Sequence, residues 1–174
     1  MEKSVFVAID MQRGLVTRNV YKKEQLMQNV NQLLDAFHTC DTPVVFFRHT
    51  NSSFAMKDTD GWQLCAELHT QPHDVIFDKS HSSVFKEKVF VSWLEKMGIK
   101  QIYIAGLVSN GCVQNTCREA LERGYKTILP MDAHSTWHKN AEAVIEDWNK
   151  KLAYAGVVVE KSEDLAKQLL TDRL

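Results

Sequence analysis

Short runs of consecutive apolar residues recur along the chain, and each has the length of a buried strand. Several runs are rich in β-branched and aromatic residues, which is typical of strands that are covered on both faces. The run KQIYIAGLV at 100–108 is the strongest of them. The predicted strands cover 4–9, 42–49, 74–79, 100–108, 125–130 and 157–160.

Between these runs, apolar residues recur every three or four positions, which is the spacing of one face of an α-helix. Glycines at 98, 124 and 156 follow three of these segments, as glycine often does at the C-terminal end of a helix. Asp60 is a candidate N-cap for a short helix. The predicted helices cover 24–40, 60–68, 84–98, 112–124, 138–156 and 162–170.

The alternation of strands and helices predicts an α/β fold with a parallel sheet covered by helices on both faces. A length of 174 residues suits one such unit, so we expect a single domain over residues 1–174. Ligands of these sheets bind outside the carboxyl ends of the strands. Asp10 follows the first strand, Lys79 ends the third and Cys112 follows the fourth. We therefore expect these three side chains at the same edge of the sheet.

Composition and charge exclude several classes of partner. The 21 basic and 22 acidic residues nearly cancel and form no block, so neither a nucleic-acid groove nor a polybasic membrane anchor is expected. The first apolar run ends at Asp10, which is too early for a signal peptide, and no run is long enough to span a bilayer. The four cysteines show no pairing pattern, which favours reduced thiols and a cytoplasmic location.

A carboxylate, an ammonium and a thiol at one sheet edge suit nucleophilic catalysis by cysteine. The thiolate is the reactive form, and a free thiol titrates near pH ~8.5. A helix N-terminus and Lys79 would stabilise a thiolate at Cys112. Asp10 could accept the thiol proton and later return it to a leaving amine. Backbone N–H groups beside Cys112 could hold the oxyanion of a tetrahedral intermediate.

Three motifs at strand ends resemble those of the isochorismatase-like cysteine hydrolase family. They read AIDMQ (8–12), DKSHSSVF (78–85) and AGLVSNGCVQNTCREA (105–120), and their order and spacing fit over nearly the whole chain. The resemblance maps the family's Asp–Lys–Cys triad onto Asp10, Lys79 and Cys112. It implies hydrolysis of a small amide, carbamoyl or ureido C–N bond through a thioester intermediate.

The resemblance also implies an architecture. The expected fold is a Rossmann-like three-layer α/β/α sandwich with a six-stranded parallel sheet, usually in a homodimer or homotetramer. A non-proline cis peptide bond is expected shortly before the cysteine, and we predict it between Val108 and Ser109. The turn would direct the N–H groups of Ser109 and Cys112 to one point, which would form an oxyanion hole. Gly111 would relieve crowding beside the nucleophile.

The sequence departs from the family pattern in ways that bear on substrate and metal. Isochorismatases proper lack the nucleophilic cysteine, so Cys112 argues against that activity. The nicotinamidase branch has an Asp-x-His metal cluster where this chain reads RHTNSSF (48–54), so we expect no metal and no cofactor. The lysine motif often carries an arginine two residues later, where this chain has His81.

Further polar and aromatic residues near the predicted edge are candidates for the substrate pocket. His134 and Trp137 lie with His138 in DAHSTWH (132–138), although residues of an oligomer contact would have the same character. The full set of pocket candidates is Gln12, His81, His134 and Trp137. Among the other cysteines, Cys117 is expected in the core, and positions 40 and 65 are expected to be ordinary thiols.

Two alternative functions stay open from the sequence. Cys112 and Arg118 have the Cys-x5-Arg spacing, and CVQNTCRE (112–119) is similar to the loop of low-molecular-weight tyrosine phosphatases. That loop requires glycine where this chain has Gln114 and a hydroxyl where it has Glu119, whose charge would repel a phosphate dianion. The other alternative is a member of the fold that binds a small ligand without turnover.

Overall fold

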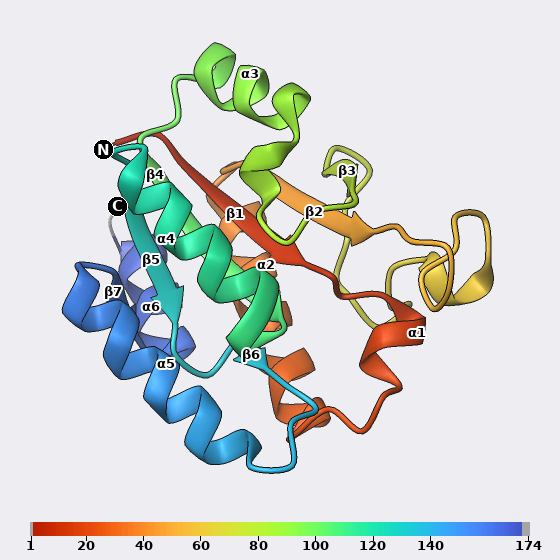
Figure 1. Ribbon diagram of the computed structural model, residues 1–174. Helices are drawn as coiled ribbons and strands as arrows, with labels where there is room; N and C mark the ends of the chain where they lie inside the picture. The colour runs from red at the N-terminus through yellow and green to blue at the C-terminus, as the bar shows by residue number, and fades with distance from the viewer. Residues whose placement is uncertain (1, 172–174) are drawn as a thin grey trace.

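The computed structural model describes residues 2–171, and a parallel β-sheet forms its centre (Figure 1). The sheet order is β3-β2-β1-β4-β5-β7, and every strand pair is parallel. The prediction of a parallel α/β fold is confirmed, and all six predicted strands are present. The strands are β1 (Ser4–Ile9), β2 (Val44–His49), β3 (Val75–Lys79), β4 (Gln101–Leu107), β5 (Lys126–Pro130) and β7 (Val158–Glu160).

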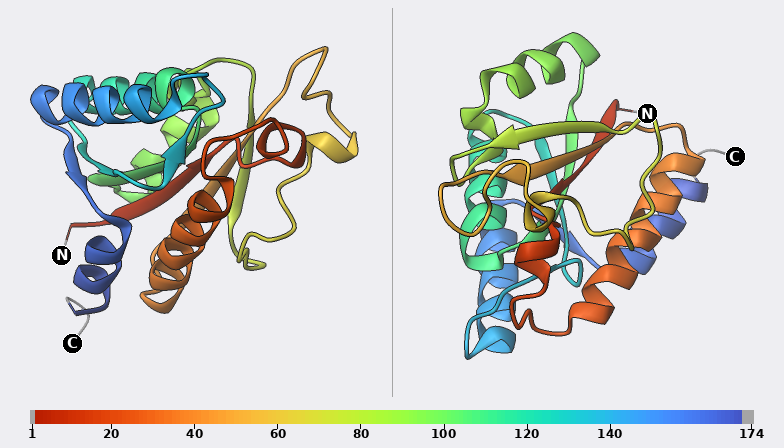
Figure 2. Two further views of the ribbon diagram at one scale, coloured as in Figure 1. Left: turned by 90° about the horizontal axis from the view of Figure 1, so that it is seen from below. Right: turned by 90° about the vertical axis from the view of Figure 1, so that its right-hand side faces the viewer.

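Helices cover both faces of the sheet, so the molecule has three layers (Figure 2). On one face lie α2 (Lys23–Thr39) and α6 (Ser162–Thr171), and on the other lie α3 (Lys88–Met97), α4 (Gln114–Glu122) and α5 (Ala141–Ala155). The pleat divides the strand side chains between two cores. In β1, Phe6 packs with the α2 side and Val7 with the α4 side, and both are fully buried.

Three predicted helices differ from the structure. Segment 60–68 forms only the turn η1 (Asp60–Trp62), because the chain that follows is held extended against Gln12 by an antiparallel bridge at Leu64. The segment 84–98 is divided into η2 (Val84–Lys86) and α3, because Glu87 adopts an extended conformation between them. The third helix, α4, begins after a wide turn, η3 (Ser109–Val113), rather than at Cys112.

Two short elements had no counterpart in the prediction. The helix α1 (Arg13–Val16) follows directly after β1. The strand β6 (His134–Ser135) pairs with the end of β4, where Gly106 lies opposite His134. Both elements are too short to produce a periodic apolar pattern.

The register of the strands brings four chain segments together at one edge. His49 pairs with Lys79 across β2 and β3, and Ile9 pairs with Gly106 across β1 and β4. Gly106 has a φ of 113°, and a Cβ at this position would lie 2.1 Å from the Ile9 carbonyl oxygen. Glycine is therefore required there for β1 and β4 to end side by side. Residues that follow β1 and β4 consequently meet the ends of β2 and β3.

Candidate active site

The Lys79 ammonium lies at the centre of a cluster of polar atoms at this edge. Its Nζ is 3.1 Å from Oδ2 of Asp10 and 3.3 Å from Sγ of Cys112. It is also 3.3 Å from Nδ1 of His49, and it donates a hydrogen bond of 3.1 Å to the carbonyl oxygen of His81. The structure therefore brings together Asp10, Lys79 and Cys112, which the sequence assigned to one edge.

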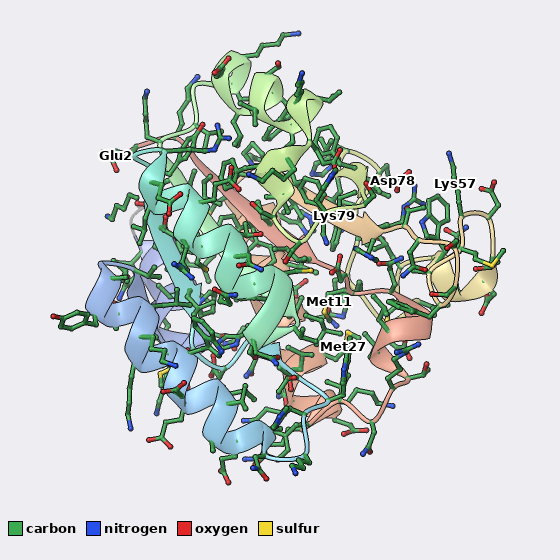
Figure 3. The ribbon with its side chains drawn as sticks, viewed as in Figure 1. Glu2, Met11, Met27, Lys57, Asp78 and Lys79 are labelled. Carbon is green, nitrogen blue, oxygen red and sulfur yellow. The ribbon has the colours of Figure 1, made fainter. Side chains whose placement is uncertain are left out.

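The strand ends position the two charged members of this cluster. Asp10 is the first residue after β1 and has a φ of 57°, in the left-handed region, so the chain turns there. Lys79 is the last residue of β3, and strand alternation places its side chain inside and that of Asp78 on the surface (Figure 3). Asp78 pairs there with Arg48 at 2.8 Å, whereas the side chain of Lys79 is completely enclosed.

Cys112 belongs to the wide turn η3 between β4 and α4. The Val108 carbonyl accepts hydrogen bonds from the N–H groups of Gly111 and Val113, at 3.0 and 3.2 Å, which closes the turn. Gly111 has φ −136° and ψ −112°, and a Cβ on it would lie 2.9 Å from Cγ2 of Val108. A larger residue at 111 would therefore displace the turn that holds the thiol.

The cis peptide bond lies between Leu107 and Val108, so the prediction of a cis bond between Val108 and Ser109 is wrong by one residue. This bond directly follows the last residue of β4. Leu107 lies opposite Ser135 and is the last paired residue of β4. The chain consequently leaves the sheet at the bond that follows Leu107.

Burial governs the protonation of the cluster. Burial raises the pKa of Asp10, while Lys79 and the Cys112 thiol act in the opposite direction. Burial also raises the pKa of Cys112, and the Asp10 carboxylate adds to this effect while Lys79 opposes it. The resting site therefore holds a neutral thiol, because burial outweighs the stabilisation of a thiolate that the sequence suggested.

One oxygen of the Asp10 carboxylate is available to the thiol. Oδ2 is bound to Lys79, whereas the buried Oδ1 has no hydrogen-bond partner among residues 2–171. A carboxylate oxygen of Asp10 and Sγ of Cys112 lie within 4.8 Å of each other. A buried carboxylate beside a neutral thiol is the arrangement that general-base activation of a cysteine requires.

The sequence analysis missed His49 as a member of this cluster. Burial lowers the pKa of His49, and Lys79 lowers it further, so the ring is neutral near pH 7 and its Nδ1 faces the ammonium. Gln12 holds this segment, because its Oε1 accepts from the His49 N–H at 2.7 Å and its Nε2 donates to the His49 carbonyl at 3.0 Å. Gln12 is fully buried, and these two bonds position His49.

The other three predicted pocket residues have different places. The ring of His81 is 63% exposed and lies 3.5 Å from Glu87, so only its carbonyl takes part in the cluster. His134 is buried and bonded to the Ser109 hydroxyl, so it supports the turn. Trp137 is 39% exposed and lies beside Arg18 at the surface.

Asp10, His49 and Cys112 together resemble a metal-binding set, since one donor atom from each lies within 4.8 Å of the others. The Lys79 ammonium, however, contacts all three of these side chains. A divalent cation would have to share this buried space with a fixed positive charge, which is unfavourable. The residues present therefore do not fit a metal.

The neighbourhood of Cys112 also differs from a phosphatase loop. Its Sγ contacts Lys79 and, at 3.9 Å, the Ser82 hydroxyl. Arg118 is exposed on α4, and in the described part of the chain it forms no hydrogen bond with Cys112. Cys117 is fully buried in the core, where burial raises its pKa, so it is an inert thiol.

The sequence of the chain is similar to those of several known hydrolases. The streptothricin hydrolase of Streptomyces noursei is 26% identical over 145 residues, which cover 81% of this chain and 52% of that protein. Nicotinamidase 3 of Arabidopsis thaliana is 24% identical over 183 residues, covering 96% of this chain and 89% of that protein. The chain thus spans about half the length of the streptothricin hydrolases that it matches.

Solved structures and the family profile agree with these relatives. A cysteine hydrolase from Pseudomonas syringae pv. phaseolicola has the same fold, with a TM-score of 0.90 at 19% identity over 99% of this chain and 94% of that one. The profile of the isochorismatase domain matches residues 4–163. The chain therefore belongs to the isochorismatase family.

Proposed function

We propose that the protein hydrolyses a small amide, carbamoyl or ureido C–N bond, with Cys112 as the nucleophile. The observation that carries this proposal is the buried Lys79 ammonium, which touches both the Asp10 carboxylate and the Cys112 thiol. The names of the relatives, a streptothricin hydrolase and a nicotinamidase, support the reaction class.

The first half-reaction forms a thioester. Asp10 accepts the thiol proton, and the thiolate attacks the carbonyl carbon, which forms a C–S bond and places the negative charge on the carbonyl oxygen. The backbone N–H groups of Ser109 and Cys112, in the turn η3, are the proposed donors to this oxyanion. Protonated Asp10 then gives its proton to the leaving nitrogen as the C–N bond breaks.

The second half-reaction restores the enzyme. Asp10 accepts a proton from water, and the resulting hydroxide attacks the thioester carbonyl. The C–S bond breaks, the acid leaves, and the sulfur recovers its proton from Asp10. Lys79 stays protonated throughout and stabilises the negative charge as it moves between Asp10 and Cys112.

The assembly and location of the protein remain predictions. We expect a homodimer or homotetramer and a cytoplasmic protein, as the sequence suggested, with no nucleic-acid partner. All four cysteines are unpaired, which fits a reducing compartment. Within residues 2–171, no helix has the length and apolar character needed to cross a membrane.

A panel of small amides, carbamoyl compounds and ureido compounds tests the proposal, with ammonia release as the readout and an aryl phosphate as the comparison. We expect ammonia from at least one amide-type compound and no phosphate release. Phosphate release without ammonia would support the phosphatase alternative instead. Saturable binding of these compounds with no turnover would support the ligand-binding alternative and contradict the proposed hydrolysis.

A further inference from the structure

Arg18 places an unpaired cation between two aromatic rings. It lies in the loop after α1, with its guanidinium carbon 4.3 Å from the ring centroid of Phe54 and 5.8 Å from that of Trp137. The side chain is exposed, and no carboxylate in the described ranges pairs with it. Arg48 and Arg123 also lie over aromatic rings, but each of them forms an ion pair, with Asp78 and Glu119 respectively.

Ring contacts connect Arg18 to the triad on one side. Phe54 stacks on His49 with centroids 6.2 Å apart and an interplanar angle of 9°. His49 in turn lies 3.3 Å from the Lys79 ammonium. An uninterrupted series of contacts therefore runs from the triad lysine to the guanidinium of Arg18.

On the other side, hydrogen bonds connect the surroundings of Arg18 to η3, the turn that carries Cys112. The residue before Trp137 is Thr136, whose hydroxyl donates to Oδ1 of Asn110 at 3.0 Å, two residues before Cys112. The loop that carries Arg18 is tied to the same segment, because the Tyr21 N–H donates to the Thr136 carbonyl at 3.0 Å. Arg18 thus belongs to a rim beside the triad, and the other members of this rim are His49, Phe54 and Trp137.

We infer that Arg18 binds a carboxylate at the end of the substrate remote from the scissile bond. This assigns the substrate class, a small amide that carries a carboxylate, and it rests on the proposed hydrolase function. A guanidinium offers a planar fork of N–H donors that matches a carboxylate, and stacking on the rings leaves the edge of the fork available. Within the triad, the only carboxylate already has its own cation in Lys79.

Paired substrates that differ in one charge test the inference. Succinamate and glutaramate carry a carboxylate where succinamide and glutaramide carry a neutral amide of the same shape. We expect wild-type kcat/KM to favour the carboxylate compounds, and Arg18→Gln to reduce this preference roughly ten- to hundredfold, mainly through KM. The neutral diamides should react equally with both proteins. Arg123→Gln, which removes a charge elsewhere on the surface, should keep the wild-type preference.

Succinate and glutarate test the site without turnover, because neither has a C–N bond. Both should protect Cys112 from iodoacetamide in the wild type and lose this protection in Arg18→Gln. Such protection without hydrolysis of any amide would support the Arg18 site while contradicting the proposed activity. An unchanged charge preference in Arg18→Gln, or an equal loss with charged and neutral amides, would overturn the inference.

Discussion

Asp10 and Lys79 act on the Cys112 thiol with opposite signs. The carboxylate raises the pKa of the thiol and the ammonium lowers it. We therefore expect Asp10→Asn to shift the pH profile of Cys112 alkylation by iodoacetamide to lower pH. Adding Lys79→Met to that variant should shift the profile back to higher pH, because the remaining positive charge is removed.

Lys86 provides the matched control for this experiment. It is an exposed lysine paired with Glu119, and it forms no hydrogen bond with Cys112 in the part of the chain that the structure describes. Lys86→Met in the Asp10→Asn background should leave the alkylation profile unchanged. Equal profiles for the Lys79 and Lys86 variants would show that the ammonium has no electrostatic role.

Asp10→Asn should also slow catalysis, even though it makes the Cys112 thiol easier to ionise. The variant keeps the shape of the side chain but cannot accept the thiol proton or return it to the leaving nitrogen. We expect kcat for ammonia release to fall by about 10²- to 10⁴-fold, with little change in KM. Asp78→Asn changes the surface carboxylate that precedes Lys79 in the chain, and this variant should retain most activity. A kcat within a few-fold of the wild type for Asp10→Asn would remove Asp10 from the mechanism.

The site was only partly accessible from the sequence. Asp10, Lys79 and Cys112 each stand at a strand end, so strand prediction together with the edge rule was enough to group them. The strand register, which places His49 opposite Lys79, could have added His49. Arg18 could not have been found in this way, because its position depends on contacts between loops that have no periodic signal.

Among the elements, the short strand β6 fixes the nucleophile turn. His134 Nε2 lies 2.9 Å from Oδ1 of Asn149, which requires the ring proton on Nε2. His134 Nδ1 can then accept from the Ser109 hydroxyl at 2.8 Å. A neutral His134 therefore links β6, the turn η3 and α5, and protonation would place a charge on this buried ring.

This linkage predicts a pH dependence of stability. Burial lowers the pKa of His134 from 6.5 to about 4, so between these values the unfolded chain binds a proton that the folded chain does not. The free energy of unfolding should consequently decrease as pH falls from about 6.5 to about 4, with roughly 3 kcal/mol from His134. Urea unfolding at several pH values measures this change in the free energy of unfolding.

Two variants isolate the contribution of His134. His134→Gln should show a weaker loss of stability between pH 6.5 and pH 4 than the wild type. His69→Gln changes a histidine that is 53% exposed, and it should keep the wild-type slope. The same slope for all three proteins would contradict the assignment of a buried neutral His134.

The elements that the sequence failed to predict share a physical cause. The segment 60–68 has a helical pattern, but pairing of Leu64 with Gln12 across a long sequence separation overrides it. Likewise β6 exists only because β4 offers it a partner. The long strands and helices, by contrast, bury one face or both and therefore carry their pattern in the chain itself.

For the molecule as a whole, the account predicts that catalysis needs no metal. Lys79 already supplies the positive charge among Asp10, His49 and Cys112. We expect dialysis against a chelator to leave ammonia release unchanged, and added divalent ions to have no effect. Loss of activity on chelation with recovery by one divalent ion would require a metal at this cluster and a different role for Lys79.

The most direct measurement of the central claim compares ammonia release by Cys112→Ala and Cys117→Ala with the same amide. The two cysteines are five positions apart, but only Cys112 touches Lys79, whereas Cys117 is fully buried in the core. The account predicts no activity above background for Cys112→Ala, with wild-type folding by circular dichroism, and most of the activity for Cys117→Ala. An active Cys112→Ala together with an inactive, folded Cys117→Ala would contradict it.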